Sequence, residues 1–443
     1  MNRPLKNLYL VSLGCARNQV DSEIMLGQLA AAGWRVTPDP EAADAIVVNT
    51  CSFIESAAEE SIDTILALAR LKETGACRCL VVAGCLPERY REQIVETLPE
   101  VDVFLGTGAF ADVVSAVEAC AGTVRCLLPD PDALVPQGSD TLRVLGAGHM
   151  AYLKIAEGCS RHCTYCIIPR LRGRQKSRPP EHVIAEAESL AAAGVQELVL
   201  VAQESTGYGW DLTPPTRLAT LLNQLAEAVP EVWIRFLYGH PESVDEATID
   251  AVAAHPNICA YFDIPIQHAS DPVLKRMGRH YGQADLLRLF EAIRQRIPHA
   301  ALRTTVIVGF PGETEQDFDA LMAFVDTIRF DHLGVFMYSD SEDLPSHRLS
   351  GHVPPKMAQK RHHRLMTLQA QISLAKNRQH LGRTFTVLVE ELVEPGLVAG
   401  RTMFQAPEVD GVTYVEDGDA VVGDRICARI TDAMEYDLSG ETA

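Results

Sequence analysis

Three cysteines in one short segment are the residues of this chain best suited to chemistry. Cys159, Cys163 and Cys166 stand at spacings of four and three residues, so their thiolates can converge from a single loop. A four-iron cluster usually takes four thiolates, and three leave one iron open to bind another molecule. The spacing therefore predicts an iron–sulfur site with a reactive vacancy.

Two simpler interpretations of these cysteines stay open as minor alternatives. A zinc knot could take His162 as its fourth ligand, although the chain has no second Cys-x2-Cys at zinc-ribbon distance. A thioredoxin-like site could use Cys163 and Cys166, but it would leave Cys159 without a role. The cluster uses every cysteine of the segment and needs no second pair of cysteines.

The same segment resembles a known family. Cys-x3-Cys-x2-Cys with an aromatic residue, Tyr165, just before the last cysteine is similar to the signature of the radical S-adenosylmethionine (SAM) enzymes. The resemblance implies that the open iron chelates SAM and that an electron from the cluster splits it to a 5′-deoxyadenosyl radical. The cofactor then carries the difficult chemistry, and the protein orients and shields it.

Composition limits the remaining possibilities. The 443 residues suggest two to four domains, and 47% apolar with 22% charged residues is ordinary for a globular protein. No apolar run approaches a membrane span, and Leu8–Leu13 is too short for a signal-peptide core, so we expect a cytoplasmic protein. Twelve cysteines are too dilute for a disulfide framework and favour metal binding.

The first part of the chain alternates strands with helices, which predicts a doubly wound parallel sheet. Cys15, Cys51 and Cys85 each follow the end of a predicted strand by one or two residues. Because the carboxyl ends of parallel strands share one edge, we expect these thiolates to meet and to bind a second cluster with an open iron. That they are ordinary core cysteines is the alternative. The strands are predicted at Tyr9–Leu13, Ala45–Val48 and Leu80–Ala83.

Four other cysteines do not fit that geometry. Cys79 lies at the opposite end of its strand from Cys85, and Cys120 falls on a helical pattern. Cys77 and Cys126 are also away from the predicted edge. We expect all four to be buried or incidental thiols, since a reducing cytoplasm would keep them unpaired.

The central part of the chain contains six further strand candidates separated by helical patterns. Six such units can curl into a partial (βα)6 version of the TIM barrel, with working loops at the carboxyl ends of the strands. The loop with Cys159, Cys163 and Cys166 is the first of these. The predicted strands are Ala151–Ala156, Glu197–Val201, Trp233–Tyr238, Tyr261–Ile266, Leu302–Val308 and His332–Tyr338.

Other loops at this edge supply residues that the radical SAM resemblance implies as SAM contacts. Each could equally be turn chemistry or a solvated polar end. A basic stretch, Arg170, Arg172, Arg174, Lys176 and Arg178, is by default a solvated loop, and the sharper interpretation is that it contacts anionic groups of SAM or of the substrate. The resemblance implies Gln203 and Glu204 at the methionine amino group of SAM and Gln267 and His268 near its ribose. It implies Gly309 and Glu313 on the adenine side and Tyr165 against the adenine.

The end of the chain reads as short strands divided by Gly, Pro and Asp turns, which predicts a small antiparallel β-barrel. It resembles the TRAM domain, a module often associated with RNA. The boundaries we expect are 6–122 for the first domain, 123–144 for a linker, 145–376 for the radical SAM core and 377–443 for the TRAM-like barrel.

Together these three parts resemble the radical SAM methylthiotransferases. One branch, the RimO type, modifies an aspartate of the twelfth protein of the small ribosomal subunit, and the other, the MiaB type, modifies a tRNA adenosine. Asn49–Ile54, Cys166–Gly173 and Tyr208–Asp211 look like the RimO type, whereas Ala16-Arg17 departs from the Pro-Lys expected there. The last 67 residues carry five Arg against thirteen Asp and Glu, which disfavours RNA and suits a basic protein partner.

The resemblance implies two [4Fe-4S] clusters and two uses of SAM. One SAM methylates sulfur near Cys15, Cys51 and Cys85, and the other yields the radical that takes hydrogen from the aspartate β-carbon. An electron donor such as flavodoxin or ferredoxin and a sulfur donor are implied as further partners, and no membrane. An iron–sulfur carrier that does not act on SAM is the alternative from another functional class.

Overall fold

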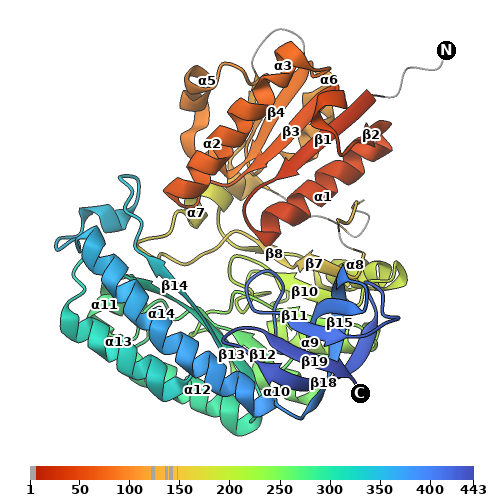
Figure 1. Ribbon diagram of the computed structural model, residues 1–443. Coiled ribbons are helices and arrows are strands. Elements are labelled where there is room, and N and C mark those ends of the chain that lie inside the picture. The colour runs from red at the N-terminus through yellow and green to blue at the C-terminus, as the bar shows by residue number, and fades with distance from the viewer. Residues whose placement is uncertain (1–5, 121–124, 135–137, 139–142, 147) are drawn as a thin grey trace.

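A six-stranded parallel sheet forms the N-terminal part of the structure, a computed structural model that describes residues 6–120, 125–134, 138, 143–146 and 148–443 (Figure 1). The central strands β3 and β4 are buried along their whole length, as apolar strands covered on both faces are. The strand order is β2-β1-β3-β4-β5-β6. The strands are β1 (Lys6–Ser12), β2 (Trp34–Val36), β3 (Ala45–Thr50), β4 (Cys79–Gly84), β5 (Val103–Leu105) and β6 (Arg125–Leu127).

Helices cover both faces of this sheet. Helices α1 (Ala16–Ala31) and α6 (Val113–Glu118) pack their apolar residues on one face, and α2 (Glu55–Ala69) and α5 (Ile94–Thr97) pack on the other. From β1 the chain turns first to β2 on one side and then to β3 on the other, so the strand order reverses between β1 and β3. The predicted doubly wound sheet is confirmed, and ligands bind such sheets at this reversal.

The central part is an open barrel of six parallel strands in two sheets, β11-β10-β7 and β12-β13-β14. A single bridge between Ile234 and Ile258 joins the two sheets, and helices lie outside (Figure 1). The partial barrel is therefore confirmed. Its strands are β7 (Met150–Lys154), β10 (Glu197–Val201), β11 (Trp233–Phe236), β12 (Tyr261–Asp263), β13 (Ala301–Val308) and β14 (His332–Met337), and its main outer helices are α8 (Pro180–Ala192), α9 (Leu218–Ala228), α10 (Glu246–Ala254), α12 (Gln283–Arg296) and α13 (Glu315–Ile328).

Both other parts of the chain contribute to the apolar cluster on the inner strands of the barrel. Val20 and Ile24 of α1 pack there from the N-terminal domain, and Leu388 and Ala406 pack there from the C-terminal barrel. All four are at most 2% exposed. The open barrel is thus completed by its neighbours, which fixes the N-terminal sheet over the loops that carry Cys159, Cys163 and Cys166.

The C-terminal barrel is closed, with strand order β15-β16-β17-β19-β18, and it follows the long helix α14 (Pro355–Asn377). Four of its pairings are antiparallel, which confirms the predicted small antiparallel barrel, and the one between β17 and β19 is parallel. The last strand closes the barrel by entering between β17 and β18. The strands are β15 (Thr384–Glu394), β16 (Leu397–Arg401), β17 (Thr413–Glu416), β18 (Arg425–Ala433) and β19 (Leu438–Thr442).

The segment predicted as a linker, 123–144, is only partly described. Arg125–Leu127 forms β6, so the N-terminal sheet extends into this segment. Residues 123, 124, 135–137 and 139–142 lie outside the described residues. Among the helices that the structure describes, none has the length and apolar character needed to cross a membrane.

Candidate metal centre

The loop with Cys159, Cys163 and Cys166, here the barrel trio, is held in shape by backbone hydrogen bonds. The Cys159 amide donates to the Gly173 carbonyl at 3.0 Å, and the Cys166 amide donates to the Cys163 carbonyl at 3.1 Å. Gly278 supports the loop from outside, and a Cβ there would lie 2.8 Å from the His162 carbonyl oxygen. The cysteines therefore sit in a fixed turn after β8 (Ala156–Glu157).

The barrel trio is buried enough to shift its own acidity. Burial raises the pKa of Cys159 to about 11 and that of Cys166 to about 12, and the nearby negative charge of Cys163 adds to both shifts. Thiols must lose their protons to bind a metal, so cluster binding would release protons here.

Cys15, Cys51 and Cys85, here the sheet trio, meet at the carboxyl edge of the N-terminal sheet. Cys51 and Cys85 directly follow β3 and β4, and Cys15 stands three residues after the end of β1; Cys85 also opens the short helix α4 (Cys85–Tyr90). Asn18 ties two strand ends together, because its amide donates to the Leu13 and Thr50 carbonyls at 2.9 Å each.

A hydroxyl and a glycine complete that edge. The Thr50 hydroxyl donates to the Ala83 carbonyl at 2.7 Å, which joins the third strand end to the other two. Gly14 has a φ of +97°, and a Cβ there would lie 2.7 Å from the Cys51 Cβ. Only glycine lets the Cys15 loop approach Cys51 this closely.

Both trios fit an iron–sulfur cluster better than a single metal ion. A single metal ion needs at least three ligand atoms close together. Among the residues that the structure describes, such a group, with all ligand atoms within 4.8 Å of one another, is formed by Cys79, Asp102 and Cys120, and neither trio forms one. The ligands of one zinc ion would be that close, because each stands about 2 Å from the metal. Three thiolates on three different irons stand farther apart, as a four-iron cluster with one open iron requires.

Two buried guanidinium groups flank the sheet trio. Burial alone would raise the pKa of Cys15, but Arg17 and Arg172 outweigh it, and the pKa is lowered. For Cys85 burial dominates over the attraction of Arg172, and the pKa rises to about 11. Arg17 also donates to the Ala202 carbonyl at 2.9 Å and lies 4.2 Å from the Tyr238 ring centroid, so it anchors Cys15 against the barrel.

The two trios lie on facing surfaces of adjoining domains. Cys85 packs with Ile167, which directly follows Cys166, and with Leu171 of the next helix turn. Farther out, Arg89 of α4 binds Asp343 of the loop after β14, with Nη2 and Oδ1 2.9 Å apart. These contacts bring the N-terminal sheet edge onto the carboxyl ends of the barrel strands.

Glu204 and Gln203 end β10 beside the barrel trio. Arg161 donates to both carboxylate oxygens of Glu204, at 2.8 and 2.9 Å, and the Ser243 hydroxyl donates to Oε1 at 2.5 Å. Gln203 donates to Glu157 at 2.8 Å, and its own carbonyl oxygen has no partner among the described residues. Glu204 is thus a fixed, 5% exposed carboxylate at the position expected for the SAM ammonium.

Tyr165 and His268 border the same edge from two other loops. The Tyr165 hydroxyl accepts a hydrogen bond from Arg279 at 2.5 Å, and its ring meets the edge of Phe310 at a centroid distance of 6.2 Å. Gln267, before His268, has a φ of +66° and bridges to Val306 of β13. These residues are held rigidly at the carboxyl ends of β12 and β13.

Gly309 and Glu313 have structural partners that explain them. Gly309 has a φ of +78°, and a Cβ there would lie 2.5 Å from the Ala358 Cβ, so the close approach it permits is that of helix α14. Glu313 accepts hydrogen bonds from the Gly309 and Phe310 amides at 2.6 and 3.0 Å and from Arg361 at 2.9 Å. Their role toward the adenine of SAM stays a prediction.

Several polar residues of the site could not be predicted from the spacing of residues in the sequence. Arg161, Ser243 and Arg279 reach it from three separate loops, and no pattern in the sequence joins them. The basic stretch divides in the structure: Arg172 is buried, whereas Arg174 has an 80% exposed side chain. Arg172 binds two carboxylates of the protein itself, Asp21 and Glu157, and contact of the basic stretch with SAM or substrate stays a prediction.

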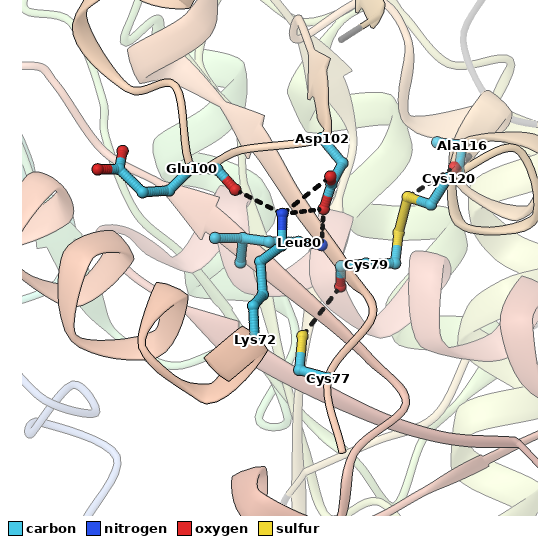
Figure 2. Close-up of a disulfide and its surroundings, with 8 residues drawn as sticks. All are labelled: Lys72, Cys77, Cys79, Leu80, Glu100, Asp102, Ala116 and Cys120. Atoms are coloured by element: carbon cyan, nitrogen blue, oxygen red, sulfur yellow. Dashed lines mark hydrogen bonds and ion pairs between the residues drawn. A yellow bond between two sulfur atoms is a disulfide. The ribbon is translucent and has the colours of Figure 1, made fainter. Parts of the chain in front are cut away.

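Two of the cysteines expected to be free thiols are paired. Cys79 at the start of β4 and Cys120 just after α6 form a disulfide with a Cα–Cα distance of 5.5 Å (Figure 2). The expectation was wrong for these two because the fold brings a strand start and a helix end together across 41 residues of sequence. Cys77 and Cys126 are free, as expected.

A cavity of about 480 Å³ reaches Cys15 of the sheet trio. Leu10, Ser12 and Gln19 line it from β1 and α1, and Glu408 lines it from the loop between β16 and β17. Cys15 of the sheet trio can therefore be approached through a cavity whose walls include residues of both terminal domains.

An open parallel barrel with a three-cysteine loop at its carboxyl edge defines the radical SAM class of enzymes. Family comparison agrees: residues 153–325 match the Radical SAM superfamily, residues 7–106 match the Uncharacterized protein family UPF0004, and residues 381–442 match the TRAM domain. The structure of the radical SAM methyltransferase TsrM from Kitasatospora setae, with tryptophan and a SAM analogue bound, has a TM-score of 0.61 at 16% identity over 84% of this chain and 89% of that one. This likeness supports the fold.

Curated relatives define the family more closely. The ribosomal protein uS12 methylthiotransferase RimO of Desulfosudis oleivorans is 55% identical over 98% of this chain and 99% of that protein. The RimO of Clostridioides difficile is 46% identical over 98% of both. The chain belongs to the RimO family of radical SAM methylthiotransferases, which confirms the resemblance read from the sequence.

Proposed function

We propose that this protein attaches a methylthio group to the β-carbon of an aspartate in ribosomal protein uS12, which its relatives are named for modifying. The observation that carries the proposal is the placement of the two cysteine trios. They lie on facing surfaces, with Cys85 packed on the residues that follow Cys166. Attaching sulfur to an unactivated carbon needs a radical source and a sulfur source close together.

The six cysteines form two cluster-binding sites. Cys159, Cys163 and Cys166 hold one [4Fe-4S] cluster, and the sheet trio, Cys15, Cys51 and Cys85, holds the other. When bound, the clusters and SAM supply the radical and the methylated sulfur. Glu204 presents a fixed carboxylate to the SAM ammonium group, and Arg161 and Ser243 keep it in place.

The charge of the chain favours a protein substrate over RNA. The formal net charge is −20, and the C-terminal barrel contributes about −8 of it. An acidic surface repels phosphate backbones, and it attracts a basic ribosomal protein over long range. A reductant of the flavodoxin or ferredoxin type and a sulfur donor complete the reaction, which we place in the cytoplasm with the ribosome.

Offering both classes of substrate tests the proposal. Anaerobically reconstituted protein, SAM and reductant are incubated with ribosomal subunits and, separately, with unmodified tRNA. We expect mass spectrometry to find the methylthio mass on uS12 alone. If the methylthio mass appeared on tRNA instead, the substrate would be a tRNA adenosine and not uS12. If no 5′-deoxyadenosine formed, the protein would be an iron–sulfur carrier that does not act on SAM.

Two variants separate the roles of the trios. Cys159→Ala should abolish 5′-deoxyadenosine formation, because the barrel trio would lose its cluster. Cys51→Ala should still form some 5′-deoxyadenosine but no methylthiolated product. If Cys51→Ala still modified uS12, the sheet trio would not be the sulfur site.

A further inference from the structure

Arg172 is the charged residue that connects the two trios. It is the last residue of α7 (Ile168–Arg172), which lies at the junction between the N-terminal sheet and the barrel (Figure 1). Its side chain is 2% exposed. Burying a guanidinium group is costly unless nearly all its donors are used, so its partners define its role.

The partners of Arg172 come from both sides of the junction: Asn18, Asp21 and Cys85 from the N-terminal domain, and Glu157 from the central domain. Nη1 donates to Asp21 of α1 at 2.8 Å and to Glu157 at 3.2 Å, and Nη2 donates to Asn18 at 2.5 Å. Nη2 also donates to the Sγ atom of Cys85 at 3.7 Å. One side chain therefore contacts a thiol of the sheet trio and the residue that opens the loop of the barrel trio.

The charges around Arg172 are balanced without its contact to the Cys85 sulfur. Lys154 binds the same two carboxylates as Arg172, Asp21 and Glu157, with Nζ 2.9 Å from the Glu157 carboxylate. The two cations thus balance the two carboxylates before any thiolate is counted. The bond to Cys85 is an addition to that balance, and it strengthens when Cys85 carries negative charge.

A hydrogen bond to a ligand sulfur has a defined effect on a cluster. It stabilises the reduced form, which carries more negative charge on its sulfurs, and so it raises the reduction potential. The same guanidinium is fixed through Glu157 to Gln203, whose amide donates to the Glu157 carboxylate at 2.8 Å. Arg172 is therefore rigidly tied to the barrel while it touches the N-terminal site.

We propose that Arg172 is a positioning residue through which the barrel domain sets the orientation and reduction potential of the cluster held by Cys15, Cys51 and Cys85. This rests on the proposed function, since it requires a cluster at the sheet trio. By holding that cluster at a higher potential than its thiolates alone would give, Arg172 keeps it from competing as a reductant with the cluster of the barrel trio.

The test measures the potential of one cluster in the full-length chain. A parent variant, Cys159→Ala/Cys163→Ala/Cys166→Ala, retains only the sheet trio, and its iron content and midpoint potential are determined by EPR-monitored redox titration. Arg172→Lys keeps the charge but loses the fork that reaches Cys85 while bound to Asp21. We expect the reduction equilibrium to shift at least tenfold against the reduced form, which is about 59 mV for one electron.

Lys154→Met is the matched control, because it disrupts the same ion-pair network without touching sulfur. We expect it to move the potential by less than a third of the Arg172→Lys shift. An unchanged potential in Arg172→Lys, or equal shifts in both variants, overturns the proposal. If Arg172→Lys loses its iron, the midpoint potential of Arg172→Gln is measured instead. Loss of iron from both variants overturns the proposal that Arg172 sets the reduction potential. A parent that binds no iron contradicts the proposed function instead.

Discussion

His268 is a buried ring whose two nitrogens have unequal partners. Nδ1 accepts a hydrogen bond from the Ser270 amide at 2.9 Å, while Nε2 has no partner within the described part of the chain. Because Nδ1 is an acceptor, the neutral ring carries its proton on Nε2. Burial lowers the pKa of His268 to about 3, so this ring is a neutral donor at the carboxyl edge of the barrel.

The depressed pKa of His268 predicts how stability changes with pH. The unfolded chain takes up this proton near pH 6.5, whereas the folded chain resists it until about pH 3. Stability that is present above pH 6.5 is therefore lost as the pH falls, by at most about 1.4 kcal/mol per pH unit. Between about pH 7.5 and 5.5 the melting temperature of His268→Gln should therefore fall less than that of the unmodified protein. His299→Gln, on the surface, should keep the original slope; equal slopes in all three proteins would contradict the assignment.

Glu204 offers a test of SAM recognition at one carboxylate. Its charge is fixed by Arg161, and Glu204→Gln would remove the partner expected for the SAM ammonium. We expect the Kd for SAM to rise about tenfold or more, because hydrogen bonds to charged groups contribute about 1.5–3 kcal/mol. Glu242→Gln is the control, since Glu242 also binds Arg161, at 2.6 Å, from a more exposed position. Equal losses of SAM affinity, measured by equilibrium dialysis, would place the ammonium elsewhere.

Residue types alone predicted the thiols but not their surroundings. Cys159, Cys163 and Cys166 share one loop, and Cys15 could be grouped with Cys51 because both follow strands. Arg172 meets Asp21 across 151 residues of sequence, a distance that only the folded sheet and barrel together span. A long side chain with several donors can contact residues that are far apart in the sequence, so its partners form no recognisable spacing pattern.

At the scale of elements, the turn after β1 depends on one glycine. Gly14→Ala would force a left-handed φ on alanine and push its Cβ against Cys51. We expect the variant to lose the cluster of the sheet trio, so that iron per chain falls by about half, while 5′-deoxyadenosine formation persists. Gly33→Ala has the same left-handed conformation, with φ +91°, but no neighbour within 4 Å, and it should retain its iron. Full iron content in Gly14→Ala would show that the turn can relax.

The disulfide between β4 and the end of α6 contributes to the N-terminal sheet. Cross-linking across about 41 residues lowers the entropy of the unfolded chain, which corresponds to about 4 kcal/mol of stabilisation. Cys120→Ser should therefore lower the melting temperature of the oxidised protein, and adding a thiol reductant should remove the difference. Cys427→Ser changes an exposed free cysteine and should have no effect. An equal melting temperature for Cys120→Ser would mean that the pair is reduced in solution.

Periodicity predicted the long buried strands well and the short ones poorly. Glu197–Val201 was predicted with its observed bounds, because five apolar or buried residues follow one another between helices. Strands β2 and β5 have only three residues each, too few for a pattern, and they exist because a neighbouring strand offers hydrogen bonds. The parallel pairing of β17 with β19 likewise depends on how the barrel closes.

At the scale of the whole molecule, buried ion pairs join the C-terminal barrel to the amino ends of the central strands. Arg401 of β16 binds Glu197 of β10 at 2.6 Å and Glu390 at 2.6 Å, and Arg235 binds Glu197 at 2.7 Å. The Tyr261 hydroxyl donates to Asp410 of the loop between β16 and β17 at 2.6 Å. Through these contacts the C-terminal barrel braces the central barrel at the amino ends of its strands.

Arg401→Met tests how strongly this brace depends on charge. Burial opposes the ionisation of Glu197, but Arg401 and Arg235 overcome it and lower its pKa. Without Arg401 the 0% exposed carboxylate of Glu197 keeps one partner, and breaking such a pair costs about 3–5 kcal/mol. We expect a lower melting temperature and earlier proteolysis between the two barrels. Arg429→Met breaks a half-exposed pair with Glu441 and should cost less than about 1 kcal/mol. If both variants melted alike, the barrels would be held together by apolar packing around Leu388 and Ala406, and the buried charges would serve only to fix their orientation.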